Sequence, residues 1–152
     1  MHVLIAADHR GFELKERLKP WLIAQGHQVT DCGSATLQPE DDYPMMSFAL
    51  AEEVVKEQKA QAILCCGSGV GASIAANKVK GARCGLGFLP QQVLAARRDD
   101  NINILALAAD YVTQEAAQEL IETFLATPFS EEPRYQRRLG QITQREQLAE
   151  LK

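Results

Sequence analysis

A glycine-rich turn in the middle of the chain constrains the fold more than any other feature. An apolar run at residues 62–65 leads into the turn at residues 67–71, and a run of small residues at 72–77 follows it. This succession is typical of a buried strand, a tight turn and a helix. Alternate glycines let the backbone turn sharply and expose its N–H groups, while the following helix directs its positive end at them. The turn therefore predicts an anion-binding site, for a phosphate or for an oxyanion that develops in a reaction.

Apolar runs alternate with helical patterns along the whole chain. The five runs expected to be strands are residues 3–7, 27–31, 62–66, 84–88 and 102–106. Nearly continuous apolar strands are typical of a parallel sheet buried on both faces. Between them apolar residues recur at helical spacing, although Pro20 should kink or strain the first helix. The alternation predicts one doubly wound α/β domain over residues 1–152.

Composition and charge narrow the possible functions. The chain has 152 residues, of which 46% are hydrophobic and 24% charged, as in an ordinary globular domain. A net charge of −4 without a basic stripe in the first two thirds argues against nucleic-acid binding. No apolar run is long enough for a membrane span, and the first residues read as a strand rather than a signal peptide. We therefore expect no membrane partner and a cytoplasmic location.

The cysteine spacing does not indicate a metal site. The four cysteines form no C-x-x-C pair, and three of them lie in or beside apolar runs. Structural zinc needs closely paired ligands, so no metal is expected and the thiols are expected to be reduced. Free cysteine behaves as a small buried apolar residue, which is the expectation for Cys32, Cys65 and Cys84.

Cys66, directly before the first glycine, places a reactive thiol beside the turn. A thiol beside oxyanion donors can remove a proton or attack a carbon, and the helix N-terminus should favour its thiolate. Asp8 and His9 follow the first expected strand, and in a doubly wound fold neighbouring strand ends share one pocket. The alternative for Asp8 and His9 is that they only cap the first helix.

The last twenty residues bring four arginines to an otherwise acidic chain. Arg134 and Arg138 are spaced i, i+4 and so share one face of a helix expected over about residues 130–150. Two adjacent guanidinium groups suit a phosphate. The helix is either a solvated terminal helix or one that packs on a partner subunit and lends its arginines to that subunit's pocket.

Together these features predict a shift of a carbonyl between C1 and C2 of a phosphorylated sugar. Such a reaction needs a base beside the carbonyl, preorganised N–H donors for the enediolate, and a group that binds the remote phosphate.

The chain resembles the type-B ribose-5-phosphate isomerase family, which includes the galactose-6-phosphate isomerase subunits. The resemblance runs from about residue 3 to residue 143. It is carried by the motifs at residues 7–12, 42–44, 66–71, 73–78 and 103–106, and by Arg134 with Arg138.

The resemblance implies a Rossmann-like three-layer α/β/α fold and a homodimer or tetramer whose active sites lie between subunits. It also implies a reaction without a cofactor or metal. Cys66 would be the base and Ser68 a hydroxyl beside it. The N–H groups of Gly67, Ser68, Gly69, Val70 and Gly71 would stabilise the enediolate, Asp8, His9 and Tyr43 would contact the sugar, and Arg134 and Arg138 would bind phosphate. The alternative for Tyr43 with Pro44 is a loop anchor before the second helix.

Three positions depart from the family pattern. Asp99 and Asp100 stand where the family has His-Asn, the histidine of which opens the sugar ring, and a one-residue slip would make Asn101 the asparagine. A carboxylate whose pKa is raised by burial could take over, so Asp99 is a candidate catalytic residue and Asp100 a substrate contact. Asp110 replaces an arginine and should weaken phosphate binding, unless Arg97 or Arg98 compensates.

The sequence thus predicts an isomerase that interconverts ribose 5-phosphate and ribulose 5-phosphate. Two alternatives stay open: an isomerase of another sugar phosphate, such as galactose 6-phosphate, and a non-catalytic member that binds a sugar phosphate. A dinucleotide-binding domain is disfavoured, because residues 85–88 lack the acidic residue expected after its glycine turn.

Overall fold

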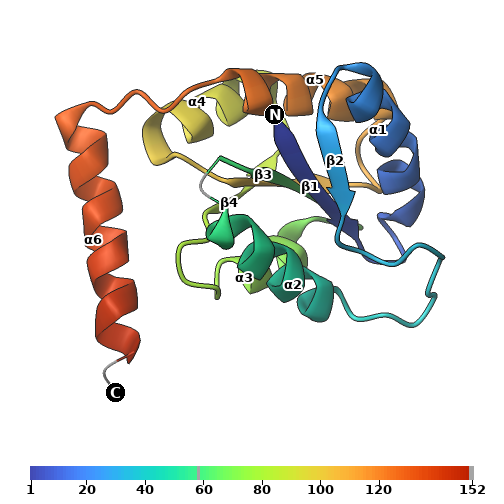
Figure 1. The fold of residues 1–152 in the computed structure, drawn as a ribbon, viewed down its shortest axis with the longest axis horizontal. Helices are drawn as coiled ribbons and strands as arrows, with labels where there is room; N and C mark the ends of the chain where they lie inside the picture. The colour runs from blue at the N-terminus through green and yellow to red at the C-terminus, as the bar shows by residue number, and fades with distance from the viewer. Residues whose placement is uncertain (58, 151–152) are drawn as a thin grey trace.

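One parallel sheet organises the molecule (Figure 1). The computed structural model describes residues 1–57 and 59–150. Within this part of the chain the five-stranded sheet has the order β2-β1-β3-β5-β4. Its strands are β1 (His2–Ala7), β2 (Gln28–Asp31), β3 (Gln61–Cys66), β4 (Cys84–Gly87) and β5 (Ile104–Ala108).

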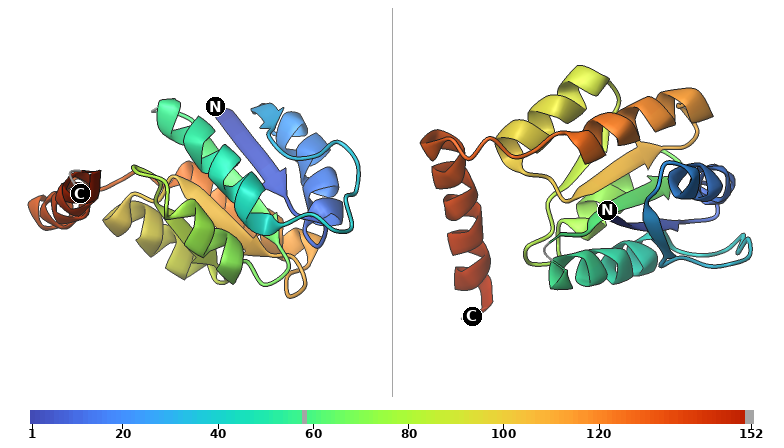
Figure 2. Two further views of the ribbon diagram at one scale, coloured as in Figure 1. Left: turned by 90° about the horizontal axis from the view of Figure 1, so that it is seen from below. Right: turned by 45° about the horizontal axis from the view of Figure 1, so that its top comes forward.

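Helices cover both faces of the sheet (Figures 1 and 2). They are α1 (Phe12–Ala24), α2 (Tyr43–Lys56), α3 (Val70–Ala76), α4 (Pro90–Asp100), α5 (Gln114–Ala126) and α6 (Pro133–Glu150). Helices α1, α4 and α5 pack with Val3, Ile5 and Ile63 in one apolar core. Helices α2 and α3 pack with Leu4 and Leu64 in the other. Since successive strand residues face opposite cores, strands buried on both sides must be apolar throughout. The predicted three-layer α/β/α fold is confirmed.

Helix α1 continues through Pro20, which lies inside it. One local expectation is wrong: strand β5 begins at Ile104, two residues later than expected. The reason is the left-handed backbone of Asn101, which ends α4 and turns the Ile102 N–H back to the Ala96 carbonyl, so Ile102 is buried in a turn.

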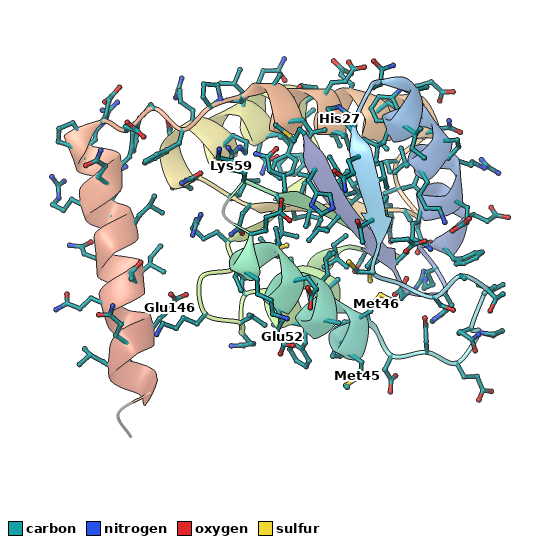
Figure 3. The ribbon with its side chains drawn as sticks, in the orientation of Figure 1. His27, Met45, Met46, Glu52, Lys59 and Glu146 are labelled. Atoms are coloured by element: carbon teal, nitrogen blue, oxygen red, sulfur yellow. The ribbon has the colours of Figure 1, made fainter. Side chains whose placement is uncertain are left out.

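Helix α6 stands apart from the sandwich (Figures 1 and 2). Its first turn is anchored through Tyr135, which is buried against the end of α4. Further along, the Glu146 carboxylate reaches the loop before β4 and accepts the Gly81 N–H at 3.3 Å (Figure 3). Between these contacts the helix exposes apolar side chains, with Ile142 at 51%. None of the helices in the described residues is both long and apolar enough to cross a membrane.

Candidate active site

The carboxyl ends of β1, β3 and β5 lie side by side and bring three loops together. Ala7 is in register with Cys65, and Cys66 with Ala108. The Asp8 N–H donates to the Cys65 carbonyl, and the Ala109 N–H to that of Cys66. As expected for a doubly wound sheet, the residues that follow these strands converge where a ligand can bind.

The Cys66 sulfur lies among opposing electrostatic influences. The N–H groups of Gly69 and Ala72, at the start of α3, bond to the sulfur and favour the thiolate. Burial disfavours the thiolate more strongly, and the hydrogen bond and negative charge of Asp8 act in the same direction. The net effect raises the pKa of Cys66 to about 11. The start of α3 therefore favours the Cys66 thiolate, as the sequence predicted, but burial and Asp8 outweigh this effect, so Cys66 is a thiol beside Asp8.

The thiol–carboxylate pair leads to a test by alkylation. In an Asp8→Asn variant the negative charge is lost while an oxygen acceptor remains, so the pKa of Cys66 should fall and its alkylation by iodoacetamide at pH 8 should accelerate. We expect about a fivefold increase or more, followed by mass spectrometry of the Cys66 peptide. Cys84, half-buried on β4, is the internal control and should react at an unchanged rate. An unchanged Cys66 rate would show that Asp8 does not control this thiol.

The glycine turn fits closely against its neighbours. Gly69 has a left-handed backbone with φ of +73°, and a Cβ there would meet the Leu86 side chain at 2.5 Å. A Cβ at Gly71 would meet the Tyr43 ring at 2.6 Å, so Tyr43, at the start of α2, lies directly on the turn. The Ser68 hydroxyl accepts the Val70 N–H at 3.3 Å. All predicted residues of the turn, with Tyr43, thus border the same surface as Cys66.

Asp8 and His9 are fixed by different partners. Asp8 is 3% exposed, and its Oδ1 accepts the N–H groups of Arg10 at 3.0 Å and Gly11 at 2.9 Å. Asp8 therefore organises the turn before α1 and faces Cys66, whereas the capping alternative is wrong, because Gly11 is the N-cap of α1 and no side chain caps the helix. Asp41 accepts the backbone N–H of His9 at 2.9 Å and lies 2.8 Å from its Nδ1. A hydrogen bond from the protonated His9 ring to Asp41 raises the pKa of His9. Sequence reasoning missed Asp41, which lies 32 residues from His9 in a loop without a motif.

The raised pKa of His9 predicts a pH dependence for substrate binding. A raised pKa keeps the imidazolium to higher pH, so KM for a sugar phosphate should stay low until pH exceeds that pKa and then rise. In an Asp41→Asn variant this rise should begin at lower pH. Kinetics between about pH 5.5 and pH 9 would show the shift, with Glu40→Gln, an exposed neighbour, as control. Superimposable profiles for wild type and Asp41→Asn would exclude a role for the pair in binding.

Asp110 is not the isolated negative charge that the sequence suggested. The Arg10 guanidinium forms an ion pair with it. The possible compensation by Arg97 or Arg98 is not seen in this subunit, since Arg97 donates to carbonyls of Ile102 and Thr127 and Arg98 pairs with Asp99. Arg10 could not be identified from a local pattern, because its partner lies 100 residues away.

The remaining predicted residues lie at the opposite edge of the sheet. Asp99 and Asp100 end α4, which runs back from the carboxyl edge toward the start of β5. Arg134 and Arg138 flank the buried Tyr135 in α6, with their guanidinium carbons 4.5 and 5.7 Å from its ring centre. We call Asp99, Asp100, Arg134 and Arg138 the amino-edge group. We call Asp8, His9, Tyr43, Cys66 and residues 67–71 the carboxyl-edge group. One subunit does not bring the two groups together.

The pKa of Asp99 also differs from the expectation. Its hydrogen bond to Arg98, at 2.6 Å, and that to Tyr135 lower its pKa. A ring-opening acid needs a raised pKa, so the expectation of a burial-raised pKa for Asp99 is wrong in this subunit. Among the described residues, no group of three or more His, Cys, Asp or Glu side chains could hold a metal ion.

Comparison with known proteins shows which sequences the chain is similar to. A sequence model of the Ribose/Galactose Isomerase family matches residues 3–142. Ribose-5-phosphate isomerase B of Mycolicibacterium paratuberculosis is 37% identical over 146 residues, covering 96% of this chain and 92% of that protein. A putative sugar phosphate isomerase of Bacillus subtilis is 38% identical over 151 residues, covering 97% and 98% of the two chains.

Solved structures similar to this chain belong to the same kind of protein as these sequence relatives. Ribose-5-phosphate isomerase B of Mycoplasma genitalium with bound ribulose-5-phosphate has a TM-score of 0.91 at 35% identity, covering 96% of both chains. That of Thermotoga maritima has a TM-score of 0.89 at 36% identity, covering 94% of this chain and 97% of that one.

The fold and these relatives identify the chain as an aldose–ketose isomerase, as the sequence predicted. More particularly, the chain belongs to the ribose/galactose isomerase family.

Proposed function

We propose that the protein interconverts ribose 5-phosphate and ribulose 5-phosphate, with Cys66 as the base. The observation that carries this proposal is the Cys66 thiol, held between the Asp8 carboxylate and the first N–H groups of α3. The relatives named as ribose-5-phosphate isomerase B, one of them with bound ribulose-5-phosphate, support this choice of substrate.

The thiol–carboxylate pair suggests how the proton moves. In the reaction the thiol proton passes to Asp8, the hydrogen-bond partner of Cys66, and the N–H groups of Gly69 and Ala72 stabilise the thiolate that forms. The thiolate removes the proton from C2 of the open-chain aldose, and the thiol returns a proton to C1 of the enediolate. Three further N–H groups of the turn, those of Gly67, Ser68 and Gly71, stabilise the negative charge on the enediolate oxygens together with the Ser68 hydroxyl. The N–H groups of Gly69 and Val70 already bond to the Cys66 sulfur and the Ser68 hydroxyl.

The separation of the two groups supports a site made by two copies of the chain. We propose that the carboxyl-edge group of one copy faces the amino-edge group of a second copy, in a homodimer or in a tetramer made of two such dimers. His9 and Tyr43 then contact the sugar from one side, and Arg134 and Arg138 bind its phosphate from the other. The apolar side chains that α6 exposes, Ile142 and Leu148, are the surface that packs on the second copy.

Asp99 and Asp100 would complete the sugar contacts. Opening the ring requires removal of the anomeric hydroxyl proton as well as protonation of the ring oxygen. Asp99 is ionised and can accept the first of these protons, although the hydrogen bond from Arg98 that lowers its pKa also makes it a weaker base.

The experiment is isomerisation by the purified protein, followed by NMR with a panel of aldose phosphates. The expected result is the highest kcat/KM for ribose 5-phosphate. A higher value for galactose 6-phosphate or another sugar phosphate would favour the alternative that Asp99 and Asp100 prompted. No turnover of any member, with binding retained, would favour a non-catalytic sugar-phosphate-binding protein.

A further inference from the structure

Arg10 projects from the turn that carries Asp8 and His9. Its backbone N–H donates to Asp8 Oδ1 at 3.0 Å, the same carboxylate that faces the Cys66 thiol. This bond fixes the point from which the side chain leaves the loop. The position of Arg10 is thus coupled to the carboxyl-edge group, although no motif assigns it a role.

The side chain crosses the first residue of the glycine turn. A Cβ at Gly67 would lie 2.5 Å from Arg10 Nε and 2.8 Å from its guanidinium carbon. Only a residue without a side chain allows this approach. The guanidinium therefore rests on the residue that follows Cys66, at the edge of the surface where the sugar phosphate must bind.

Asp110 holds the Arg10 guanidinium in this place but uses only one of its nitrogens. The ion pair uses Nη2 of Arg10, and the structure gives its other guanidinium nitrogens no side-chain partner among the described residues. The Arg10 side chain is 58% exposed and that of Asp110 30%. The Asp110 N–H donates to the Gly67 carbonyl at 3.1 Å, so the carboxylate belongs to the same rigid edge. A guanidinium with free donors, aligned by a carboxylate, can bind an anionic oxygen.

We propose that Arg10 binds the phosphate of the sugar phosphate and that Asp110 is a positioning residue, which aligns the guanidinium and weakens its pull on the phosphate. This inference rests on the proposed function and adds to it a cation from the same subunit as Cys66. Arg134 and Arg138 approach from the second copy, so Arg10 would bind the opposite side of the phosphate.

The test compares variants of opposite expected sign. Arg10→Met keeps a stem over Gly67 and removes the charge, and should raise KM for ribose 5-phosphate about tenfold or more with kcat changed less than about threefold. Asp110→Asn releases the guanidinium and should lower KM, but not in a chain that also carries Arg10→Met. Arg17→Met, one helical turn beyond Glu13 on α1, removes an exposed arginine and is the charge-matched control. It should change KM less than about twofold.

The same variants separate binding from a structural role. If Arg10 only fastened the two loops, Asp110→Asn would raise KM as Arg10→Met does, and that result would overturn the proposal, as would an Arg10→Met variant that behaves like Arg17→Met. Should the wild type turn over no aldose phosphate, titration with inorganic phosphate still decides. A dissociation constant raised about tenfold in Arg10→Met supports the proposal, and an unchanged constant overturns it.

Discussion

Replacing Cys66 with alanine is expected to lower kcat by about 10³-fold, the loss typical of a missing general base. The methyl group cannot accept the C2 proton, and no other thiol can take its place. Of the four cysteines, Cys65 is completely buried, with a pKa raised far above the usual range by burial. NMR of the conversion of ribose 5-phosphate in the presence of excess variant would measure the residual rate.

Two comparisons make this result specific. Cys84→Ala removes a half-buried thiol on β4 and should leave kcat within about twofold, because Cys84 belongs to neither group of site residues. Cys66→Ala should keep KM for ribose 5-phosphate within about threefold, because it removes an interaction with the transition state rather than with the phosphate. A loss of activity below tenfold in Cys66→Ala would eliminate Cys66 as the base.

The parts of the fold that sequence could predict are those with a local cause. Residues 62–66 are apolar throughout because β3 is buried on both faces, and the glycines after it are required by a left-handed backbone and by close neighbours. The position of Cys66 before this turn could therefore be predicted from the sequence. At Ile102 the sequence pattern was misleading, because an apolar residue buried in a turn resembles the first residue of a buried strand.

Contacts between distant segments left no local pattern. Asp41 meets His9, and Arg10 meets Asp110, only because parallel strands bring separate loops to one edge. The state of Cys66 was unpredictable for a different reason. Its pKa depends on a balance between the N–H groups of α3, which the sequence indicated, and burial with Asp8, which only the packed structure establishes.

The proposed division of the site between two copies leads to a prediction with a second large expected effect. Mixing Cys66→Ala with a double variant, Arg134→Ala with Arg138→Ala, should restore activity to two proteins that are each nearly inactive. In a heterodimer one site carries all the substitutions and the other carries none. With random exchange half of the dimers are mixed, so about a quarter of wild-type activity should return.

The control mixture combines Cys66→Ala with Cys66→Ser. Both substitutions remove the same thiol from the carboxyl-edge group, so every site in that mixture lacks its base and no activity should return. Native mass spectrometry would confirm that subunits exchange in both mixtures. If the first mixture stays inactive although mixed dimers form, the two groups do not share a site. The arginines of α6 would then need another role, because in its own subunit the start of this helix is anchored at the end of α4, on the edge of the sheet opposite Cys66.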